Sequence, residues 1–395
     1  MITIDLRSDT FTLPDAGMRQ AIHAADVGNS GYGEDPAVNR LEAEMAEYFG
    51  VEAGVFLPSA TMAGQIAIRV WSRPGDLVLI EEFGHNYYFE TGSMAAIAGA
   101  QARLLQGERG IVPPRAVENA CSQLDNQHAH TSLIVLENTS NFGGGTIYPQ
   151  QTLDAIFSIA AKRRLPVHVD GARIWNAIVA SGCDPERQIQ PGGSMSVCFS
   201  KGLGAPMGAV LLGPAEFIKE ARRIQAMLGG VMRQVGFMAA AALYGFHHNL
   251  QRLAEDHVHC LAMARLLAGN PALEVDLASV QTNILYCRVK AGPERAAGLV
   301  EQLAAQGIGA LALGSLLRLV TSLNVSAKDC AHAAEEIVRL LAYYNERRVD
   351  VRKNHSRMAS QRLYHHALQR KSRWCGARCR WPAGSAHAGH RRRAE

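Results

Sequence analysis

The sequence SVCFSKGLGAPMGAVLLG, residues 196–213, places a lysine directly after a mostly apolar run. The apolar residues before Lys201 predict a short buried strand, and residues 208–213 predict another. Three glycines leave the space around the lysine free of side chains: Gly202, Gly204 and Gly208. A lysine at the end of a buried strand, with the backbone cleared around it, is a candidate reactive amine. The alternative is a surface turn that happens to contain a lysine.

Apolar runs of the same kind alternate with helical patterns over the first 215 residues. Strands are predicted at 76–80, 132–138, 165–173, 196–201 and 208–213. A helix is predicted at 152–164, with Thr152 as its N-cap. Nearly continuous apolar strands separated by helices are typical of a mostly parallel α/β sheet covered on both faces. In such sheets ligands bind at the carboxyl ends of the strands, where Asp170 and Lys201 are expected to lie.

The pattern of predicted strands and helices, together with the composition of the tail, divides the chain into three parts. We expect a large domain over 1–250, a small α/β domain over 251–346 and a basic, disordered tail over 347–395. Residues 351–395 contain 12 Lys/Arg and one acidic residue, whereas the remaining 350 residues contain 28 Lys/Arg and 35 acidic residues. The apolar content of 48% is typical of a globular enzyme. The sequence contains no run of 18 apolar residues, so no membrane span is predicted.

The spacing between Asp170 and Lys201 is 31 residues, about one strand–helix–strand unit. It predicts an acid and an amine on neighbouring strand ends. Pyridoxal 5′-phosphate needs this pair, because it forms a Schiff base with a lysine and requires an acid at its pyridinium nitrogen. The alternative for the acid is a local ion pair with Arg173, three residues further on.

A phosphate site and a ring-stacking residue are predicted from two further motifs. LPSATMAGQIAIRV, residues 57–70, offers small residues followed by a helix, and amides at a helix start bind phosphate. The alternative is an ordinary helix cap. His85 follows the predicted strand at 76–80 and could stack on a flat ring, although a lone histidine is also common as a packed or solvated residue.

These motifs together resemble, in order, those of the low-specificity L-threonine aldolases. That family belongs to the fold-type-I pyridoxal-phosphate enzymes of the β-eliminating lyase superfamily. The resemblance covers about residues 3–346 and is carried by DLRSDTFTLP, GYGEDPAVNRLE, LPSATMAGQ, HNYYFETG, LENTSNFGGG, HVDGARIWNA, FSKGLGAPMGA, LGGVMRQVG and LRLVTSLNVS. It implies a large domain with a mostly parallel seven-stranded sheet and a small C-terminal α/β domain.

The resemblance implies pyridoxal 5′-phosphate as cofactor and assigns residues to its ring. Lys201 would be the Schiff-base lysine and Asp170 the partner of the pyridine nitrogen. His85 would stack on the ring. Arg173 would contact the ring hydroxyl and the substrate carboxylate.

The resemblance also implies contacts to the phosphate and to the substrate. Ala60 and Thr61 would hold the phosphate, and Arg233 would reach a phosphate across a subunit interface. Ser8 and Arg318 would fix the substrate carboxylate, for which a bidentate arginine is suited. A homodimer or homotetramer with shared active sites is therefore expected.

The implied reaction is retro-aldol cleavage of a β-hydroxy-α-amino acid to glycine and an aldehyde, with threonine, allo-threonine or a bulkier relative as substrate. The base that takes the β-hydroxyl proton is left open. The family position falls on Gln127 by direct count, and a shift of one residue would make it His128. Otherwise His85 or a water held by the phosphate would serve.

Two other functions remain possible from the residues. One is a related pyridoxal-phosphate enzyme, namely a β-eliminating lyase, a racemase or a transaldolase, and the other is a non-catalytic binding protein. We expect no metal, since the spacing of Cys375, Cys379, His387 and His390 fits a zinc site poorly. The eight scattered cysteines and the charged N-terminal residues predict a cytoplasmic protein, and the lack of a long apolar run predicts no membrane contact. The basic tail, which ends in RRRAE, could contact nucleic acid, but a solvated disordered tail is the preferred interpretation, so no nucleic-acid partner is expected.

Overall fold

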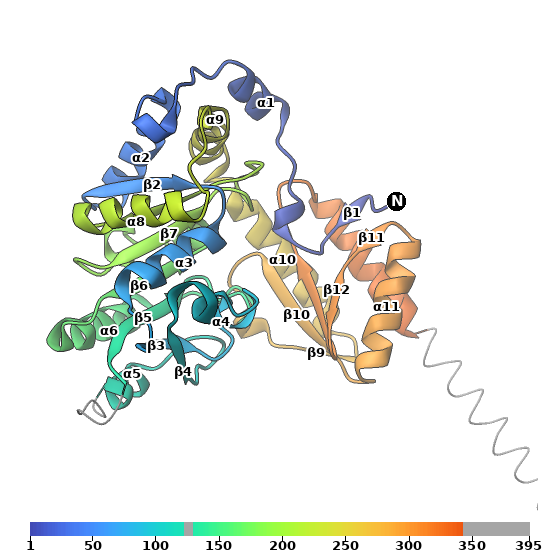
Figure 1. Ribbon diagram of the computed structural model, residues 1–395. Coiled ribbons are helices and arrows are strands. Elements are labelled where there is room, and N and C mark those ends of the chain that lie inside the picture. Colours follow the sequence, from blue (N-terminus) through green and yellow to red (C-terminus); the bar gives the residue numbers. More distant parts are fainter. Residues whose placement is uncertain (122–128, 343–395) are drawn as a thin grey trace, which may run out of the picture. The chain divides into compact units, whose positions relative to one another are not determined.

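The computed structural model describes residues 1–121 and 129–342 (Figure 1). Residues 1–340 form one compact unit. The predicted division at residue 250 stays a prediction, and the predicted tail lies outside the described residues. None of the helices in the described ranges has the length and apolar character needed to cross a lipid bilayer.

A seven-stranded sheet forms the centre of the larger part of this unit. Its strands, in spatial order, are β2 (Ala53–Leu57), β8 (Ala209–Gly213), β7 (Ser194–Cys198), β6 (Val167–Gly171), β5 (Thr131–Glu137), β3 (Leu77–Glu81) and β4 (Gln101–Leu105). Strand β8 runs antiparallel to both of its neighbours, and the other pairs are parallel. The predicted mostly parallel seven-stranded α/β sheet is therefore confirmed.

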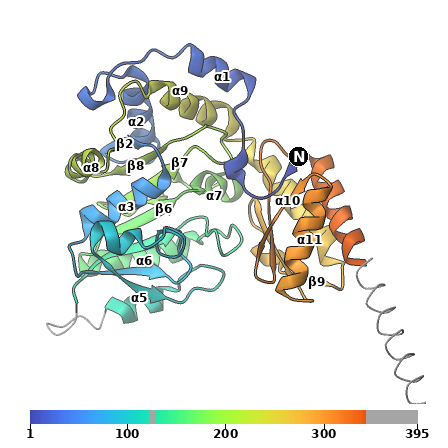
Figure 2. The same ribbon diagram turned by 45° about the vertical axis from the view of Figure 1, so that its right-hand side comes forward.

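Helices cover both faces of this sheet (Figures 1 and 2). On one face lie α3 (Ala60–Trp71), α8 (Ala215–Met227) and the π-helical turn η3 (Met94–Ala98). On the other lie α2 (Pro36–Tyr48), α5 (Pro114–Cys121), α6 (Gln150–Arg163), α7 (Ile174–Ser181) and α9 (Gly236–Tyr244). Strand β5 is apolar at successive positions because both faces of the sheet are covered. Leu133 and Val135 pack toward the first face, and Ile134 and Leu136 pack toward the second.

The predicted start of helix α6 was two residues too late. Pro149, not Thr152, is its N-cap, and the Thr152 amide donates to the Pro149 carbonyl at 2.8 Å. The extended conformation of Pro149, with φ −58° and ψ 135°, directs the chain into the helix, so Thr152 is already inside the first turn.

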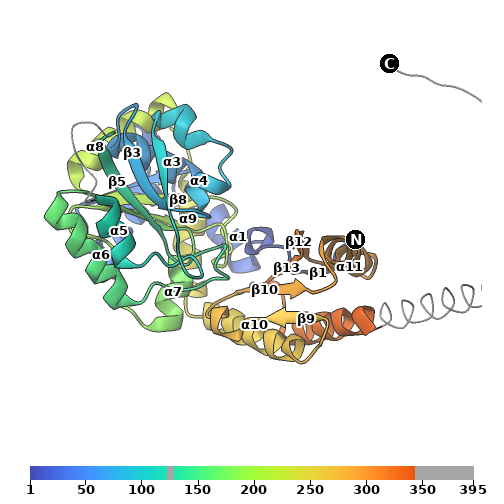
Figure 3. The ribbon, with the colours of Figure 1, turned by 90° about the horizontal axis from the view of Figure 1, so that it is seen from below.

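A smaller antiparallel sheet follows the large one in sequence, in the order β12 (Leu311–Leu313), β13 (Leu316–Val320), β10 (Ile284–Val289) and β9 (Leu273–Val275). Helix α10 (Leu253–Ala268) lies alongside β9 and β10, as Figure 3 shows. Helix α11 (Pro293–Ala305) and the helical residues 327–342 complete this part.

The N-terminal residues join this smaller part rather than the first sheet. Strand β1 (Ile4–Asp5) pairs in parallel with β11 (Ile308–Gly309), and the Val320 amide donates to the Leu6 carbonyl at 2.8 Å. Residues 7–9 are thereby held next to the end of β13. The remaining short helices are α1 (Ala16–His23), α4 (His85–Tyr88), η1 (Asp9–Phe11), η2 (Ser30–Tyr32), η4 (Pro185–Gln188), η5 (Gly245–Asn249) and η6 (Leu277–Ser279).

Candidate active site

Asp170 and Lys201 lie at the carboxyl ends of adjacent parallel strands. Asp170 is the next-to-last residue of β6 and pairs in register with Ser196 of β7, and Lys201 follows the end of β7 by three residues. The Asp170 carboxylate is buried and accepts a hydrogen bond from the Ala172 amide at 3.0 Å. The 31-residue spacing thus corresponds to neighbouring strand ends.

The turn that carries Lys201 is closed by backbone hydrogen bonds and needs its glycines. Gly204 and Gly208 have φ values of 82° and 117°, which side chains disfavour, and a Cβ on Gly208 would lie 2.7 Å from the Phe56 ring. Lys201 is half-buried, and its charge affects the pKa values of Asp9 and His85. The partial burial of Lys201 and the glycines packed around its turn argue against a simple surface turn.

The predicted alternative of a local pair between Arg173 and Asp170 is wrong. Arg173 instead binds Asp9 with two hydrogen bonds of 2.7 Å, from Nε and from Nη2. Both side chains are buried, and Asn283 also donates to Asp9 at 3.0 Å. Burial would raise the pKa of Asp9, but the charges of Arg173 and Lys201 hold it below its usual range. A fixed carboxylate–guanidinium pair results.

Asn141 joins this pair to Arg318. Its Oδ1 accepts from Arg173 Nη1 at 3.4 Å and from Arg318 Nη2 at 3.1 Å, while Arg318 Nη1 donates to the Arg7 carbonyl at 2.8 Å. Arg318 Nε is buried and has no partner in the described structure. Burial and the charge of Arg173 lower the pKa of Arg318. The two arginines that the resemblance assigns to the substrate are therefore brought together.

Ser8 lies beside the same group of residues. It is the N-cap of η1, where its Oγ accepts from the Thr10 amide at 3.3 Å and from the Thr10 hydroxyl at 3.0 Å. The next residue is Asp9, so the cap places a half-buried hydroxyl next to the Asp9–Arg173 pair.

His85 is the first residue of α4 and is held by two carboxylates. Its Nδ1 lies 3.3 Å from Glu90 Oε1, and its backbone amide donates to Glu137 at 3.1 Å. Glu90 is buried and also accepts hydrogen bonds from the side-chain amides of Gln65 and Asn86. Burial alone would lower the pKa of His85, but the bond to Glu90 and the charges of Asp170 and Glu137 outweigh it, and the pKa is raised.

Glu137 is a buried acid at the end of β5, paired in register with Asp170. Burial, followed by the charge of Asp170, raises the pKa of Glu137 to about 7. The backbone amide of Asn141 donates to the Glu137 carboxylate at 3.0 Å. Glu137 thus connects the His85 segment to the segment that carries Asn141.

The N-terminus of α3 borders a pocket of about 420 Å³ near His85. Ser59 caps the helix by accepting from the Met62 amide at 3.1 Å. Within residues 1–121 and 129–342, the amides of Ala60 and Thr61 have no protein acceptor. Such amides at the start of a helix suit a phosphate.

The residues present therefore fit pyridoxal 5′-phosphate. Free amides stand at the start of α3, a buried carboxylate at Asp170, an imidazole at His85 and a half-buried amine at Lys201. Among the residues that the structure describes, no cluster of three or more His, Cys, Asp or Glu side chains could hold a metal ion.

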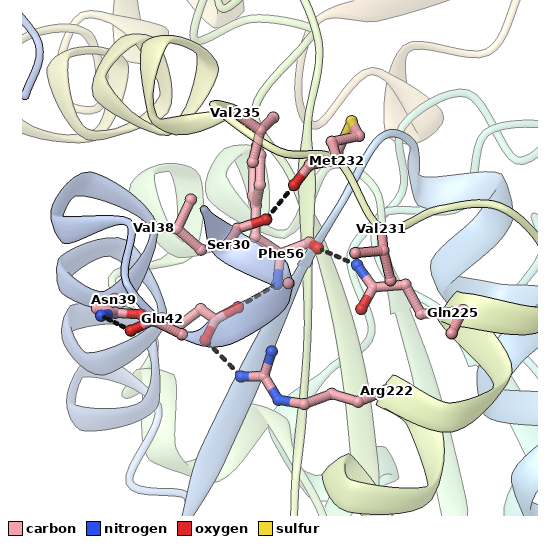
Figure 4. A pocket seen from close by; sticks show the side chains of 13 residues that line it. Ser30, Val38, Asn39, Glu42, Phe56, Arg222, Gln225, Val231, Met232 and Val235 are labelled. Atoms are coloured by element: carbon pink, nitrogen blue, oxygen red, sulfur yellow. Dashed lines mark hydrogen bonds and ion pairs between the residues drawn. The ribbon is translucent and has the colours of Figure 1, made fainter. Parts of the chain in front are cut away.

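Arg233 lies in a different environment. It is exposed in the loop before α9, and its carbonyl accepts from the Ser30 amide at 3.0 Å. The loop borders a pocket of about 290 Å³, in which Arg222 bonds to Glu42 at 2.5 Å (Figure 4). Ala226 also lines this pocket.

Gln127 and His128 lie outside the described residues, so the alternatives for the base stay predictions. Four residues of the site were missed in the sequence: Asp9, Glu90, Glu137 and Asn141. Glu137 did carry a usable signal, because, like Asp170, it is an acid at the end of an apolar strand.

Comparison with known proteins finds beta-eliminating lyases and threonine aldolases as relatives. A family model for beta-eliminating lyases matches residues 5–290. The low specificity L-threonine aldolase of Escherichia coli K12 is 40% identical over 332 residues, covering 84% of this chain and 97% of its own. A probable low-specificity L-threonine aldolase 2 of Arabidopsis thaliana is 40% identical over 296 residues, covering 74% and 83%.

Solved structures show the same fold at low sequence identity. The Leishmania major threonine aldolase superposes with a TM-score of 0.73 at 18% identity, covering 85% of this chain and 99% of its own. An aspartate aminotransferase from Thermus thermophilus superposes with a TM-score of 0.64 at 16% identity, covering 85% and 92%.

Proposed function

This chain belongs to the beta-eliminating lyase family and, within it, to the low-specificity L-threonine aldolases, and we propose that it cleaves threonine or a related β-hydroxy-α-amino acid between Cα and Cβ to glycine and an aldehyde. The observation that carries the proposal is that Asp170 and Lys201 lie at the carboxyl ends of β6 and β7, while Arg173, which follows β6, is joined through Asn141 to Arg318 of the smaller sheet.

Pyridoxal 5′-phosphate, when bound, supplies the electron sink for the pair released from the broken bond. Lys201 would provide the amine that holds its aldehyde carbon. Asp170 would accept the hydrogen bond of the pyridine nitrogen, from a buried position where a charge is weakly screened. The amides of Ala60 and Thr61 would hold the phosphate, and His85 would lie against the ring.

The substrate carboxylate is assigned to Arg318 by charge. Asp9 neutralises Arg173, so the three charges of Asp9, Arg173 and Arg318 sum to one positive charge, which suits one carboxylate. Arg318 Nε is a buried donor without a protein partner, and Asn141 fixes the other end of the guanidinium. Ser8 would add a hydroxyl contact. Holding the carboxylate selects which Cα bond stands perpendicular to the ring and breaks.

The β-hydroxyl proton must leave for the bond to break, and an imidazole is suited to take it. We propose His128 for this role, with His85 as the alternative. Glu90 is bound to Nδ1 of His85, so Nδ1 carries a proton and Nε2 is left as an acceptor.

We also propose a homodimer or homotetramer in a cytoplasmic compartment. Exposed apolar side chains gather near the Arg233 loop, and Tyr32 is 82% exposed. The exposed apolar side chains near this loop are Tyr32, Met227, Leu228, Val231 and Phe237. A second copy would cover them and bring Arg233 to a neighbour's phosphate. The six described cysteines are free thiols, which suits a reducing compartment. Sedimentation that found a fully active monomer would contradict the shared site.

The reaction itself is tested by product analysis of the cofactor-loaded enzyme. With L-threonine and L-allo-threonine, glycine and acetaldehyde should appear in equal amounts. Release of ammonia with a keto acid would indicate a β-eliminating lyase instead, and inversion at Cα without cleavage would indicate a racemase.

A further inference from the structure

Glu137 is a buried acid that no step of the proposed reaction uses. It is the last residue of β5 and is 7% exposed. Its in-register partner on β6 is Asp170, which is 4% exposed, so two acidic residues lie side by side at the carboxyl ends of neighbouring strands. Burial of one acid beside another is costly, and such acids gather at functional sites.

Both carboxylate oxygens of Glu137 accept a hydrogen bond from the backbone of another segment. Oε2 accepts from the His85 amide at 3.1 Å, and Oε1 accepts from the Asn141 amide at 3.0 Å. A glutamine side chain has one accepting oxygen and a donating NH2 group, whereas a carboxylate accepts on both oxygens. Holding two amides at this position therefore requires the carboxylate.

The bond to His85 fixes the start of a short helix. His85 is the first residue of α4, and the first amides of a helix have no acceptor within the helix. Glu137 supplies an acceptor from β5, while Glu90 contacts the imidazole from the segment after α4. Glu137 thus fixes the backbone of His85, and Glu90 fixes its ring.

The bond to Asn141 acts on the two arginines. The Asn141 side chain accepts from Arg173 at 3.4 Å and from Arg318 at 3.1 Å, so the position of its backbone decides where the two guanidinium groups meet. Burial would lower the pKa of Arg173, but the charge of Asp9 and the hydrogen bonds to it, and then the charge of Glu137, raise that pKa. Glu137 therefore lies near the arginines as well as near the imidazole.

We infer that Glu137 is a positioning residue of the active site, whose carboxylate ties the backbones of His85 and Asn141 to the strand end beside Asp170. It holds the residue that lies against the cofactor ring and the residues that bind the substrate carboxylate at a fixed spacing. This inference rests on the proposed function, because the roles of the imidazole and of the two arginines come from it.

Removing the carboxylate should weaken the binding of both cofactor and substrate. Glu137→Ala leaves two amides without an acceptor, and Glu137→Gln leaves one. A buried donor without a partner is costly, so each affected segment should shift. We expect the dissociation constants for pyridoxal 5′-phosphate and for glycine to rise by about 5- to 100-fold in Glu137→Ala, and at least one of them to rise in Glu137→Gln.

The test follows the visible absorbance of the bound cofactor. The full-length enzyme is titrated with pyridoxal 5′-phosphate, and the cofactor-saturated enzyme is then titrated with glycine. Glycine has the carboxylate of the substrate but no β-hydroxyl group, so its binding reports the carboxylate site without the base. Urea denaturation of each variant shows whether the fold is retained.

Glu81→Ala is the matched control. Glu81 is also a buried acid at the end of a strand, in this case β3, the neighbour of β5. Its hydrogen-bond partners among the described residues are the backbone amides of Phe83 and Gly107. It shares the burial and the strand-end position of Glu137 but holds neither of the two segments.

A second comparison separates positioning from general stability. Asn141→Ala retains the amide that Glu137 binds but removes the side chain that binds the arginines. In this background Glu137→Ala should change glycine binding little, whereas its effect on cofactor binding, which is exerted through His85, should persist. A residue that merely stabilises the fold would change glycine binding equally in both backgrounds.

Unchanged dissociation constants in both Glu137 variants, or a change in only one of the two constants in Glu137→Ala, would overturn the inference and leave the proposed aldol cleavage standing. An equal loss of glycine binding with and without the Asn141 side chain would also overturn it. If Glu137→Ala does not fold, Glu137→Gln is carried through the same comparison, and if neither folds while Glu81→Ala does, Glu137 serves the fold and the inference is wrong. A wild type that binds the cofactor but releases no glycine from threonine would overturn the proposed function itself.

Discussion

If His85, the alternative to His128, is the base, replacing Glu90 with glutamine should shift the acidic limb of the pH profile of the reaction to lower pH. Glutamine keeps an oxygen that can accept from His85 Nδ1, so the ring position is preserved, but the negative charge is lost. Glu90 is one of three carboxylates that raise the pKa of His85, and it is the one in direct contact with the imidazole ring, at 3.3 Å.

The size of the shift follows from this contact. Two unit charges 3.3 Å apart interact by about 5 kcal/mol at an effective dielectric constant near 20, and this is an upper limit. Opposite charges at such distances shift a pKa by about one to three units, each worth about 1.4 kcal/mol. The His85 side chain is 37% exposed, so water screens the pair and we expect the lower end, about one unit.

The assay is kcat/KM for L-threonine as a function of pH, in wild type, Glu90→Gln and the control Glu301→Gln, an exposed residue of α11. A base is active when unprotonated, so a lower pKa for His85 moves the acidic limb of the profile to lower pH. The control should coincide with wild type. If the limb of Glu90→Gln also coincides with wild type, the group that titrates is not His85, and the role of the base is left to His128.

Other predictions concern the buried pairs and the base. Asp9→Asn leaves Arg173 buried without its counter-charge and should lower the free energy of unfolding by about 3–5 kcal/mol. Urea denaturation at neutral pH measures this change, and an unchanged midpoint would show that the pair does not stabilise the fold. Asp170→Asn should fold normally but lose most activity, because the neutral amide cannot keep the pyridine nitrogen protonated; unchanged kinetics would assign that role to another residue. His128→Ala should lower turnover by about 10- to 100-fold and Gln127→Ala much less, and the reverse order in steady-state kinetics would move the base elsewhere.

Much of the fold was predictable because its signals are local. The strand before Lys201 and the strand containing Asp170 are short apolar runs bounded by turns, and a parallel connection of about 31 residues places their ends side by side. The start of α6 was misplaced because threonine is a common N-cap residue, whereas the observed N-cap is Pro149.

The contacts that assemble the site were not predictable in the same way. Asp9 and Arg173 are 164 residues apart, and no spacing rule links them. Their contact depends on the pairing of β1 with β11, which ties the N-terminal residues to the smaller sheet. The meeting of Phe142 with Tyr286 likewise depends on how the loop after β5 packs on β10. Such long-range contacts follow from packing in three dimensions.

The central claim is that Lys201 is the amine that holds pyridoxal 5′-phosphate. Borohydride reduction of the cofactor-loaded enzyme, followed by peptide mass spectrometry, should find the pyridoxyl group on Lys201, and Lys201→Ala should lose both the visible absorbance of the bound cofactor and the cleavage of threonine. A pyridoxyl group on another lysine, or full turnover in Lys201→Ala, would contradict the account.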